Sequence, residues 1–187
     1  MKVLMIIPAY NEEESILNTV MSIVEYRKKV DFDLDYIVIN DGSVDRTKEI
    51  LDSHHLNAIH LVMNLGIGGA VQTGYKYALE KNYDVAVQFD GDGQHDIESL
   101  DALLEPIRRQ QADLVVGSRF IGDKSSEFQT TFMRRFGITI ISAFIKLTTG
   151  KRILDTTSGY RLANHDIIRQ FAARYPIKYP EPESIVH

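Results

Sequence analysis

Five short apolar runs recur along the chain, and each stops abruptly at a polar or glycine-rich turn. The runs are Lys2–Ile7, Tyr36–Ile39, Ile59–Met63, Val85–Phe89 and Leu114–Gly117. Their length and their many branched residues are typical of buried strands. Segments with apolar residues at helical spacing separate the runs. This alternation predicts βαβ units, and therefore an α/β fold with a mostly parallel central sheet flanked by helices.

Polar residues after the runs indicate where helices begin. Asn11 is a favourable helix N-cap residue, and Glu14 completes a capping-box pattern with it. By the same argument we expect Ser43 to cap a second helix and Asn164 to cap a short one. Further helices are expected over about 71–81, 96–110 and 130–149, and an extended segment over 155–162.

Composition narrows the function classes. The net charge of −5 argues against general nucleic-acid binding. Between Arg119 and Arg152 seven basic residues stand against two acidic ones, an excess that suits phosphates, an anionic membrane surface or a solvated basic face. The longest apolar stretch, Phe136–Leu147, is too short to span a bilayer, which needs about 20 residues. The absence of cysteine excludes disulfides and fits a reducing compartment.

Asp90 and Asp92 follow the fourth apolar run and flank a glycine. Ligands of open α/β sheets bind at the carboxyl ends of the strands, where these carboxylates are expected. Two such groups can reach one metal ion or one ribose–phosphate unit, and oxygen ligands suit Mg²⁺ or Mn²⁺. The turns 8–12, 41–43 and 64–70 are expected at the same edge. The pattern predicts a nucleotide site, and a solvated acidic turn is the alternative for the aspartates.

The glycine-rich segment 64–70 excludes two common nucleotide sites. It does not match G-x-G-x-x-G, and it lacks the Lys-Ser/Thr pair of a P-loop. A classical dinucleotide site and a P-loop ATPase are therefore disfavoured. The glycines also fit a tight turn that leads into a packed helix.

Six segments resemble the inverting family 2 glycosyltransferases of GT-A fold. They are Ile7–Glu13, Asn40–Ser43, Asn64–Ala70, Asp90–Gln94, Gly117–Arg119 and Ser158–Arg161. They occur in family order and are most similar to dolichol-phosphate-mannose synthases and to bacterial polyprenyl-phosphate or cell-envelope sugar transferases. The resemblance implies one catalytic domain over 1–187, with a nucleotide-binding half over about 1–118 and an acceptor-side half over about 119–187. Related domains usually continue further, so a truncated C-terminus is expected.

The resemblance also assigns the donor side of the site. It implies a nucleotide-sugar pocket formed by Pro8, Tyr10, Asn11, Glu12, Asp41, Gly69 and Asp90. Asp41 would bind the uracil or guanine ring, and Asp90 would contact the ribose. Asp92, with Gln94, would bind the Mg²⁺ or Mn²⁺ that bridges the donor diphosphate. Such a metal neutralises charge on the leaving nucleoside diphosphate.

On the acceptor side, Arg119, Arg134 and Arg135 are candidates for binding an acceptor phosphate, because the planar guanidinium suits that group. Asp155 is the candidate catalytic base for a sugar hydroxyl acceptor. A lipid phosphate is already anionic and needs no base. Asp155 would then be an acceptor-site residue, or a turn carboxylate paired with a nearby arginine.

The expected activity is metal-dependent, inverting transfer of a sugar from a UDP- or GDP-sugar to a polyprenyl phosphate or a cell-envelope glycan. The very apolar segment 130–149 suits a lipid acceptor with peripheral membrane association, a homodimer interface or core packing. The expected location is the cytoplasm, at the inner face of the membrane for a lipid acceptor. A sugar-phosphate nucleotidyltransferase and a non-catalytic nucleotide-sugar-binding module are the alternatives. The absence of tryptophan argues against processive synthases, whose Gln-x-x-Arg-Trp motif the chain lacks.

Overall fold

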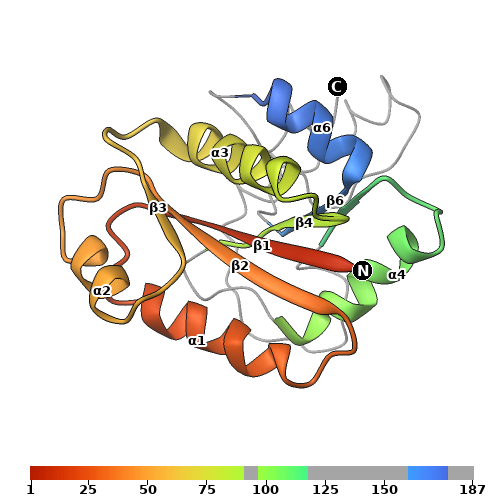
Figure 1. The fold of residues 1–187 in the computed structure, drawn as a ribbon, viewed down its shortest axis with the longest axis horizontal. Helices are drawn as coiled ribbons and strands as arrows, with labels where there is room; N and C mark the ends of the chain where they lie inside the picture. The colour runs from red at the N-terminus through yellow and green to blue at the C-terminus, as the bar shows by residue number, and fades with distance from the viewer. Residues whose placement is uncertain (91–96, 118–159, 177–187) are drawn as a thin grey trace, which may run out of the picture.

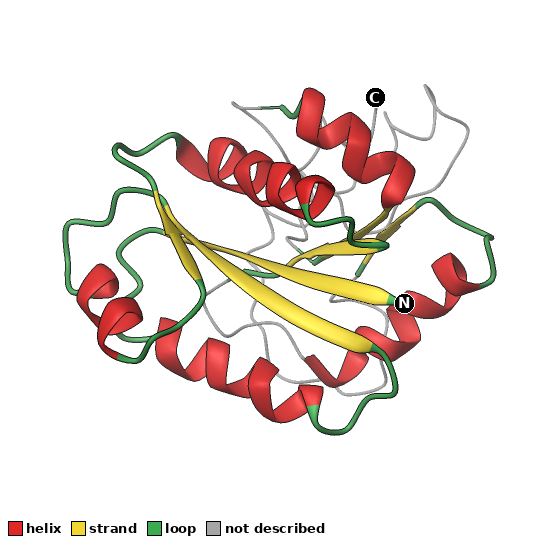
Figure 2. Cartoon of the chain, viewed as in Figure 1, coloured by secondary structure: helices red, strands yellow, loops and turns green. Residues whose placement is uncertain are grey.

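The computed structural model describes residues 1–90, 97–117 and 160–176, which form one six-stranded sheet with helices on both faces (Figures 1 and 2). The strands are β1 (Lys2–Ala9), β2 (Asp33–Asn40), β3 (Ala58–His60), β4 (Val85–Gln88), β5 (Leu114–Val116) and β6 (Arg161–Asn164). Their order in the sheet is β3-β2-β1-β4-β6-β5. β1 to β4 pair in parallel, and β6 runs antiparallel to β4 and β5. The expected mostly parallel α/β sheet is confirmed.

The described helices divide between the two faces of the sheet. They are α1 (Ile16–Arg27), α2 (Thr47–Ser53), α3 (Gly66–Glu80), α4 (Leu100–Arg108) and α6 (His165–Ala173), with a short 3-10 helix, η1 (Ile97–Ser99). α3 and α6 cover one face, while α1, α2 and α4 lie on the other (Figure 1). None of the helices in the described part of the chain is long and apolar enough to cross a membrane.

Strand β1 explains why the sheet is buried on both sides. Val3, Leu4, Met5, Ile6 and Ile7 are all fully buried. Side chains alternate across a strand, so Val3, Met5 and Ile7 join the core under α1, while Leu4 and Ile6 join the core under α3. A continuous apolar run is the pattern that a parallel strand with two covered faces requires.

The sheet has its topological switch point between β1 and β4. From β1 the chain adds β2 and then β3 on one side, and β4 then pairs on the other side of β1. β1 pairs with β2 as far as Ala9, but with β4 only as far as Ile6, whose carbonyl accepts the N–H of Phe89 at 2.9 Å. The next bond toward β4 would need an N–H on Pro8, which proline lacks. The β1–β4 ladder therefore ends where this class of sheet binds its ligands.

Two expected helix starts are wrong, and for the same reason. Helix α1 begins at Ile16 and not at Asn11, and α2 begins at Thr47 and not near Ser43. Asn11 has a φ of +57°, outside the helical region, and the side chains of Asn11 and Ser43 bond to each other's loops. The third expected cap is confirmed: the Asn164 side chain accepts the N–H of Ile167 at 3.0 Å and opens α6.

The glycine-rich segment differs from the expected loop. Helix α3 already begins at Gly66, so most of the segment lies in its first turns. Further along α3, a Cβ on Gly74 would lie 2.2 Å from Cγ2 of Ile6, because the helix packs directly on β1. Gly66, with a φ of +78°, makes the turn into α3, and Gly68 and Gly69 are buried in the first turns of that helix, which agrees with the alternative interpretation of the glycines. The expected helix over 130–149 lies outside the described residues.

Candidate functional site

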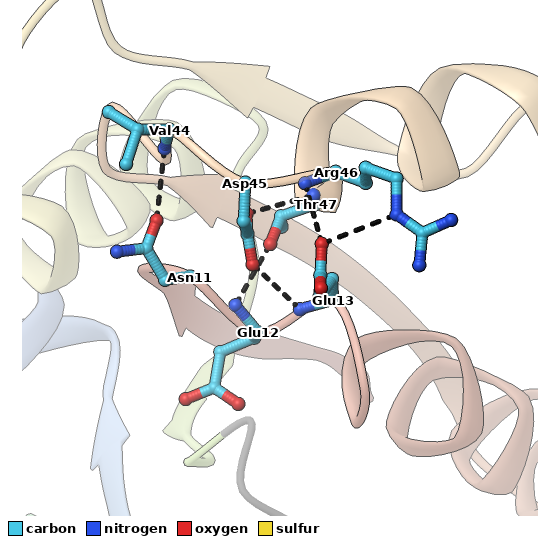
Figure 3. Close-up of polar contacts among 7 residues, drawn as sticks. All are labelled: Asn11, Glu12, Glu13, Val44, Asp45, Arg46 and Thr47. Carbon is cyan, nitrogen blue, oxygen red and sulfur yellow. Dashed lines mark hydrogen bonds and ion pairs between the residues drawn. The ribbon is translucent and has the colours of Figure 1, made fainter.

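The loops that follow β1 and β2 are bonded to each other at the carboxyl edge of the sheet (Figure 3). The N–H of Asn11 donates to Oγ of Ser43 at 2.9 Å, and the N–H of Val44 donates to Oδ1 of Asn11 at 2.9 Å. The positive φ of Asn11 turns its backbone N–H and its side chain toward the second loop. This reciprocal pair fixes the position of the first loop beside the second.

A second set of contacts lies deeper between the same loops (Figure 3). The N–H groups of Glu12 and Glu13 donate to Oγ1 of Thr47 at 2.8 Å and to Oδ2 of Asp45 at 3.1 Å. In return, the N–H of Arg46 donates to Oε2 of Glu13 at 2.9 Å. These five bonds, with a longer one of 3.4 Å from Nε of Arg46 to the same Oε2 of Glu13, join the two loops, and the rigid edge that they form suits preorganised ligand binding.

Asp45 is the central acceptor of this junction. Its partial burial alone would raise the pKa of the carboxyl group, but hydrogen bonds from Thr47 and from the Glu13 N–H outweigh burial and hold the pKa below its ordinary value. The N–H of Thr47 donates to Oδ1 of Asp45 at 2.9 Å. Sequence reasoning missed Asp45 and Thr47. The signal available was the Asp45-Arg46-Thr47 sequence, because an aspartate often accepts the N–H of the residue two positions later in an Asx turn.

Asp41 lies at the end of β2 and is 3% exposed. Its N–H donates to the carbonyl of Ala9 at 2.9 Å, and its Oδ1 accepts the N–H of Leu65 at 2.7 Å. Its Oδ2 has no hydrogen-bond partner among the described residues. This oxygen is not among the fully buried polar atoms of the described side chains that lack a partner, so it keeps contact with solvent. A buried carboxylate with one open oxygen is suited to accept a hydrogen bond from a ligand.

The loop after β3 lies against Gly42, next to Asp41. Gly42 has a φ of +70°, and a Cβ on it would lie 2.8 Å from the backbone nitrogen of Asn64. Only glycine fits this close approach. The side chain of Asn64 accepts the N–H of Gly66 through Oδ1 at 2.9 Å. The loops after β1, β2 and β3 thus form one continuous edge.

The other residues predicted to bind the donor differ in how far they are exposed. Pro8 is buried within β1, Glu12 is half-buried, and Tyr10 is 47% exposed at the edge. Gly69 is buried inside α3, where a Cβ would lie 2.5 Å from Cβ of Leu65. Packing against Leu65 therefore accounts for the glycine at position 69 without a ligand.

Asp90 lies half-buried directly after β4, across the switch point from the β1 loop. Its neighbours in the predicted metal site, Asp92 and Gln94, lie outside the described residues, as do Arg119, Arg134, Arg135 and Asp155. Within the described ranges no three His, Asp or Glu side chains come together as a metal cluster. The structure thus brings Pro8, Tyr10, Asn11, Glu12 and Asp41 to the edge where Asp90 also lies.

A buried polar cluster behind this edge was not expected from the sequence. Gln88 of β4 and Arg161 of β6 are register partners and are each 1% exposed. The hydroxyl of Tyr175 donates to Oε1 of Gln88 at 3.2 Å. Burial raises the pKa of nearby Tyr75 well above its ordinary value. The signal was a glutamine at the end of the apolar strand β4 and an arginine at the start of β6.

Comparison with known proteins places the chain in one protein family. Residues 5–171 match the family described as "Glycosyl transferase family 2". Undecaprenyl-phosphate mannosyltransferase of Micrococcus luteus is 35% identical over 175 residues, which cover 90% of this chain and 69% of that protein. UDP-N-acetylglucosamine–dolichyl-phosphate N-acetylglucosaminyltransferase of Methanococcus voltae is 33% identical over 175 residues, which cover 84% of this chain and 67% of that protein.

Solved structures share the fold at lower identity. Glucosyl-3-phosphoglycerate synthase of Mycobacterium tuberculosis, solved with Mn²⁺, UDP-glucose and phosphoglyceric acid, aligns with a TM-score of 0.64 at 19% identity. The alignment covers 89% of this chain and 57% of that one. The chain thus spans about two thirds of the two curated relatives and little more than half of this structural neighbour.

Proposed function

The chain belongs to glycosyltransferase family 2, and from this premise we propose that it transfers a sugar, with inversion, from a nucleotide-diphospho sugar to a polyprenyl phosphate. The observation that carries the proposal is the edge of three interlocked loops after β1, β2 and β3, which extends to the β1/β4 switch point and carries the open oxygen of Asp41. The two curated relatives are named for undecaprenyl and dolichyl phosphates, which supports a lipid phosphate over a glycan as acceptor.

On the donor side, the base would bind against Asp41 and the exposed ring of Tyr10. Asp90 would then contact the ribose. This assignment follows the order of the strands, because β2, β1 and β4 are neighbours and the residues follow their carboxyl ends. A nucleotide laid along this edge spans from the β2 loop to the β4 loop, with its diphosphate at the switch point.

A divalent metal fits the donor atoms available after β4. Asp90 supplies a half-buried carboxylate, and Asp92 and Gln94 add oxygen donors within four residues along the chain. Oxygen ligands of this kind suit Mg²⁺ or Mn²⁺, and a structural neighbour was solved with Mn²⁺. We propose Asp92 and Gln94 as the protein ligands. When bound, the metal neutralises charge on the nucleoside diphosphate as it leaves.

The proposed reaction is a single displacement. An oxygen of the acceptor phosphate forms the bond to the anomeric carbon while the bond from that carbon to the diphosphate oxygen breaks, so the configuration inverts. The acceptor oxygen is already anionic and gives up no proton, so no base is needed. Arg119, Arg134 and Arg135 would bind the acceptor phosphate. Asp155 would be an acceptor-site residue, and would act as a base only toward a hydroxyl acceptor.

The test is transfer from labelled nucleotide sugars in the presence of Mn²⁺, with polyprenyl phosphate in vesicles and soluble sugars as competing acceptors. The proposal predicts label in the lipid fraction and its loss in an Arg134→Ala/Arg135→Ala double variant. Arg169→Ala, at an exposed arginine of α6, is the matched control and should transfer normally. Label in soluble sugars alone, with no loss in the double variant, would contradict the lipid acceptor.

A further inference from the structure

His60 of the edge strand β3 lies beside Asn40, the last residue of β2. The two residues are register partners, and both side chains lie on the side of the sheet that α2 covers, as do those of Ala58 and Val38. Nδ1 of His60 lies 3.0 Å from Nδ2 of Asn40, and Nε2 lies 3.0 Å from Oδ1 of Asp52 in α2. Asn40 is 2% exposed, so the ring contacts a buried amide on one side and a surface carboxylate on the other.

The polarity of these contacts fixes the protonation of the ring. The N–H of Ser43 donates to Oδ1 of Asn40 at 3.1 Å. Because a backbone N–H can only donate, the oxygen of the Asn40 amide faces Ser43 and its NH₂ group faces His60. Nδ1 of His60 must therefore accept, and the ring carries its one proton on Nε2, which donates to Asp52. The hydrogen bonds from Asp52 to Ser43 thus form one chain in which the imidazole is neutral.

A proton added at Nδ1 of His60 breaks this chain. The new N–H would face the NH₂ group of Asn40, and two donors cannot bond to each other. If the amide turned over, its oxygen would accept from the ring, but its NH₂ group would then face the N–H of Ser43. In either orientation the chain loses one hydrogen bond. Histidine is the side chain that ordinarily gains a proton between about pH 5 and 8.

Among the described residues, the charged groups that contact the ring directly or through one further bond both belong to α2. Asp52 contacts Nε2, and Nζ of Lys48 donates to Oδ2 of the same carboxylate. Strand β2 contributes the neutral amide of Asn40, and α3 lies on the other face of the sheet (Figure 1). The bonds from Lys48 and from His60 hold the pKa of Asp52 below its ordinary value of 3.8. Asp52 therefore stays ionised where histidine titrates, and His60 is the group of the chain whose charge changes there.

Ser43, at the end of this chain, joins the loop after β2 to the loop after β1, because its Oγ accepts the N–H of Asn11 at 2.9 Å. The segment held between Asn40 and Ser43 also carries Asp41. From this geometry, and resting on the proposed function, we propose that His60 is a positioning residue for the donor. Its neutral ring holds the loop after β2 in the arrangement that binds the nucleotide, and its protonation loosens that loop and weakens nucleotide binding.

Nuclear magnetic resonance of the protein without nucleotide tests the hydrogen-bond chain itself. The ring nitrogen shifts of His60 should show a proton on Nε2 at about pH 7.5, and the amide shift of Ser43 should follow the protonation of His60 as the pH falls. His60→Asn offers an oxygen in place of Nδ1 but gains no proton in this range, so its Ser43 amide should not respond in this way. His55→Asn, at an exposed histidine after α2, is the matched control and should behave as the wild type. A proton on Nδ1 of the neutral ring, or a Ser43 amide that does not follow His60, would overturn the proposal.

Calorimetric titration with UDP and with GDP, each with Mn²⁺, tests the effect on the donor site. The nucleotide and the metal also depend on pH, so the quantity compared is the ratio of wild-type affinity to that of His60→Asn. We expect this ratio to fall about three- to tenfold between about pH 7.5 and about pH 5.5, which corresponds to the loss of one hydrogen bond. His60→Leu removes the acceptor and should bind about three- to tenfold more weakly than His60→Asn at both pH values. Melting curves check that each variant is folded, and the comparison with His60→Asn decides if His60→Leu is not.

The two proposals fail in different ways. Nucleotide binding with a ratio that stays constant between the two pH values would overturn the positioning role of His60 and leave the glycosyltransferase proposal standing. Binding of neither nucleotide at either pH would overturn both.

Discussion

The N–H of Leu65 donates a 2.7 Å hydrogen bond to Oδ1 of Asp41, and this bond ties the start of helix α3 to the end of strand β2. As a result, the two oxygens of this buried carboxylate have different roles. One oxygen holds the loop after β3 in place, and the other remains open at the edge of the sheet. The sequence shows the aspartate after a strand, but only the fold shows that one of its oxygens already accepts a hydrogen bond from Leu65.

Removal of the Asp41 carboxylate should weaken nucleotide binding. Asp41→Ala removes both the open acceptor and the anchor of the Leu65 N–H, and we expect a loss of about 1–3 kcal/mol in nucleotide binding, the cost of leaving buried partners unpaired. Calorimetry measures the affinity, and a melting curve monitors the fold. Asp31→Ala, whose side chain is 94% exposed, is the matched control. Unchanged nucleotide affinity with an unchanged melting curve would reject the role of Asp41.

Asp45 should make the loop junction dependent on pH. The pKa of Asp45 in the folded protein lies below its ordinary value of 3.8, so its carboxylate contributes stability above pH 3.8 that is lost as pH falls through the lower folded pKa. Asp45→Asn should therefore melt at a lower temperature than the wild type at pH 7, and the gap should shrink at pH 3. Asp31→Asn should show no such gap. A gap for Asp45→Asn that is the same at both pH values would show that its charge is not involved.

Gly74→Ala should destabilise the protein although alanine favours helices. The helix propensity of alanine is better than that of glycine by about 1 kcal/mol, but the added methyl group would lie 2.2 Å from Cγ2 of Ile6 and 2.9 Å from its Cγ1. Overpacking of this kind costs about 1–3 kcal/mol, so we expect a net loss in urea denaturation. In a double variant with Ile6→Ala, the loss of unfolding free energy should be smaller than the sum of the losses in the two single variants. Strict additivity would mean that the contact is not as close as described.

Nucleotide binding should depend on a divalent metal through Asp92. We expect a nucleoside diphosphate to bind more tightly in Mn²⁺ or Mg²⁺ than in EDTA, because the metal offsets the diphosphate charge. Asp92→Ala should lose most of that gain while keeping the melting temperature. Asp101→Ala, at an exposed carboxylate of α4, is the control. The metal assignment fails if wild-type affinity is equal in EDTA and in Mn²⁺.

The strands and the confirmed cap were predictable because their causes are local in sequence. Runs such as Val3–Ile7 are apolar throughout, and the Asn164 side chain bonds an N–H only three residues ahead. Asn11 and Ser43 carry the same capping chemistry, but their partners lie more than thirty residues away. A capping rule that considers only neighbouring residues cannot tell whether such a side chain bonds a nearby backbone N–H or a distant one. Both helix starts were therefore predicted wrongly.

The same distinction holds for the candidate site. The carboxylates at strand ends were predictable from single positions, because ligands of such sheets bind at that edge. The open and occupied oxygens of Asp41 were not, since they depend on the loop that carries Leu65. The buried pair of Gln88 and Arg161 was missed because each interrupts an apolar run without any local sign of its partner strand.

The position of the nucleotide is the most direct test of this account. A crystal structure of the protein soaked with a nucleotide sugar and Mn²⁺ would show it. We predict the base against Asp41, the diphosphate at the carboxyl ends of β1 and β4, and the metal ion beside Asp90 and Asp92. A nucleotide bound at the opposite edge of the sheet, or along the outer face of α2, would contradict the account.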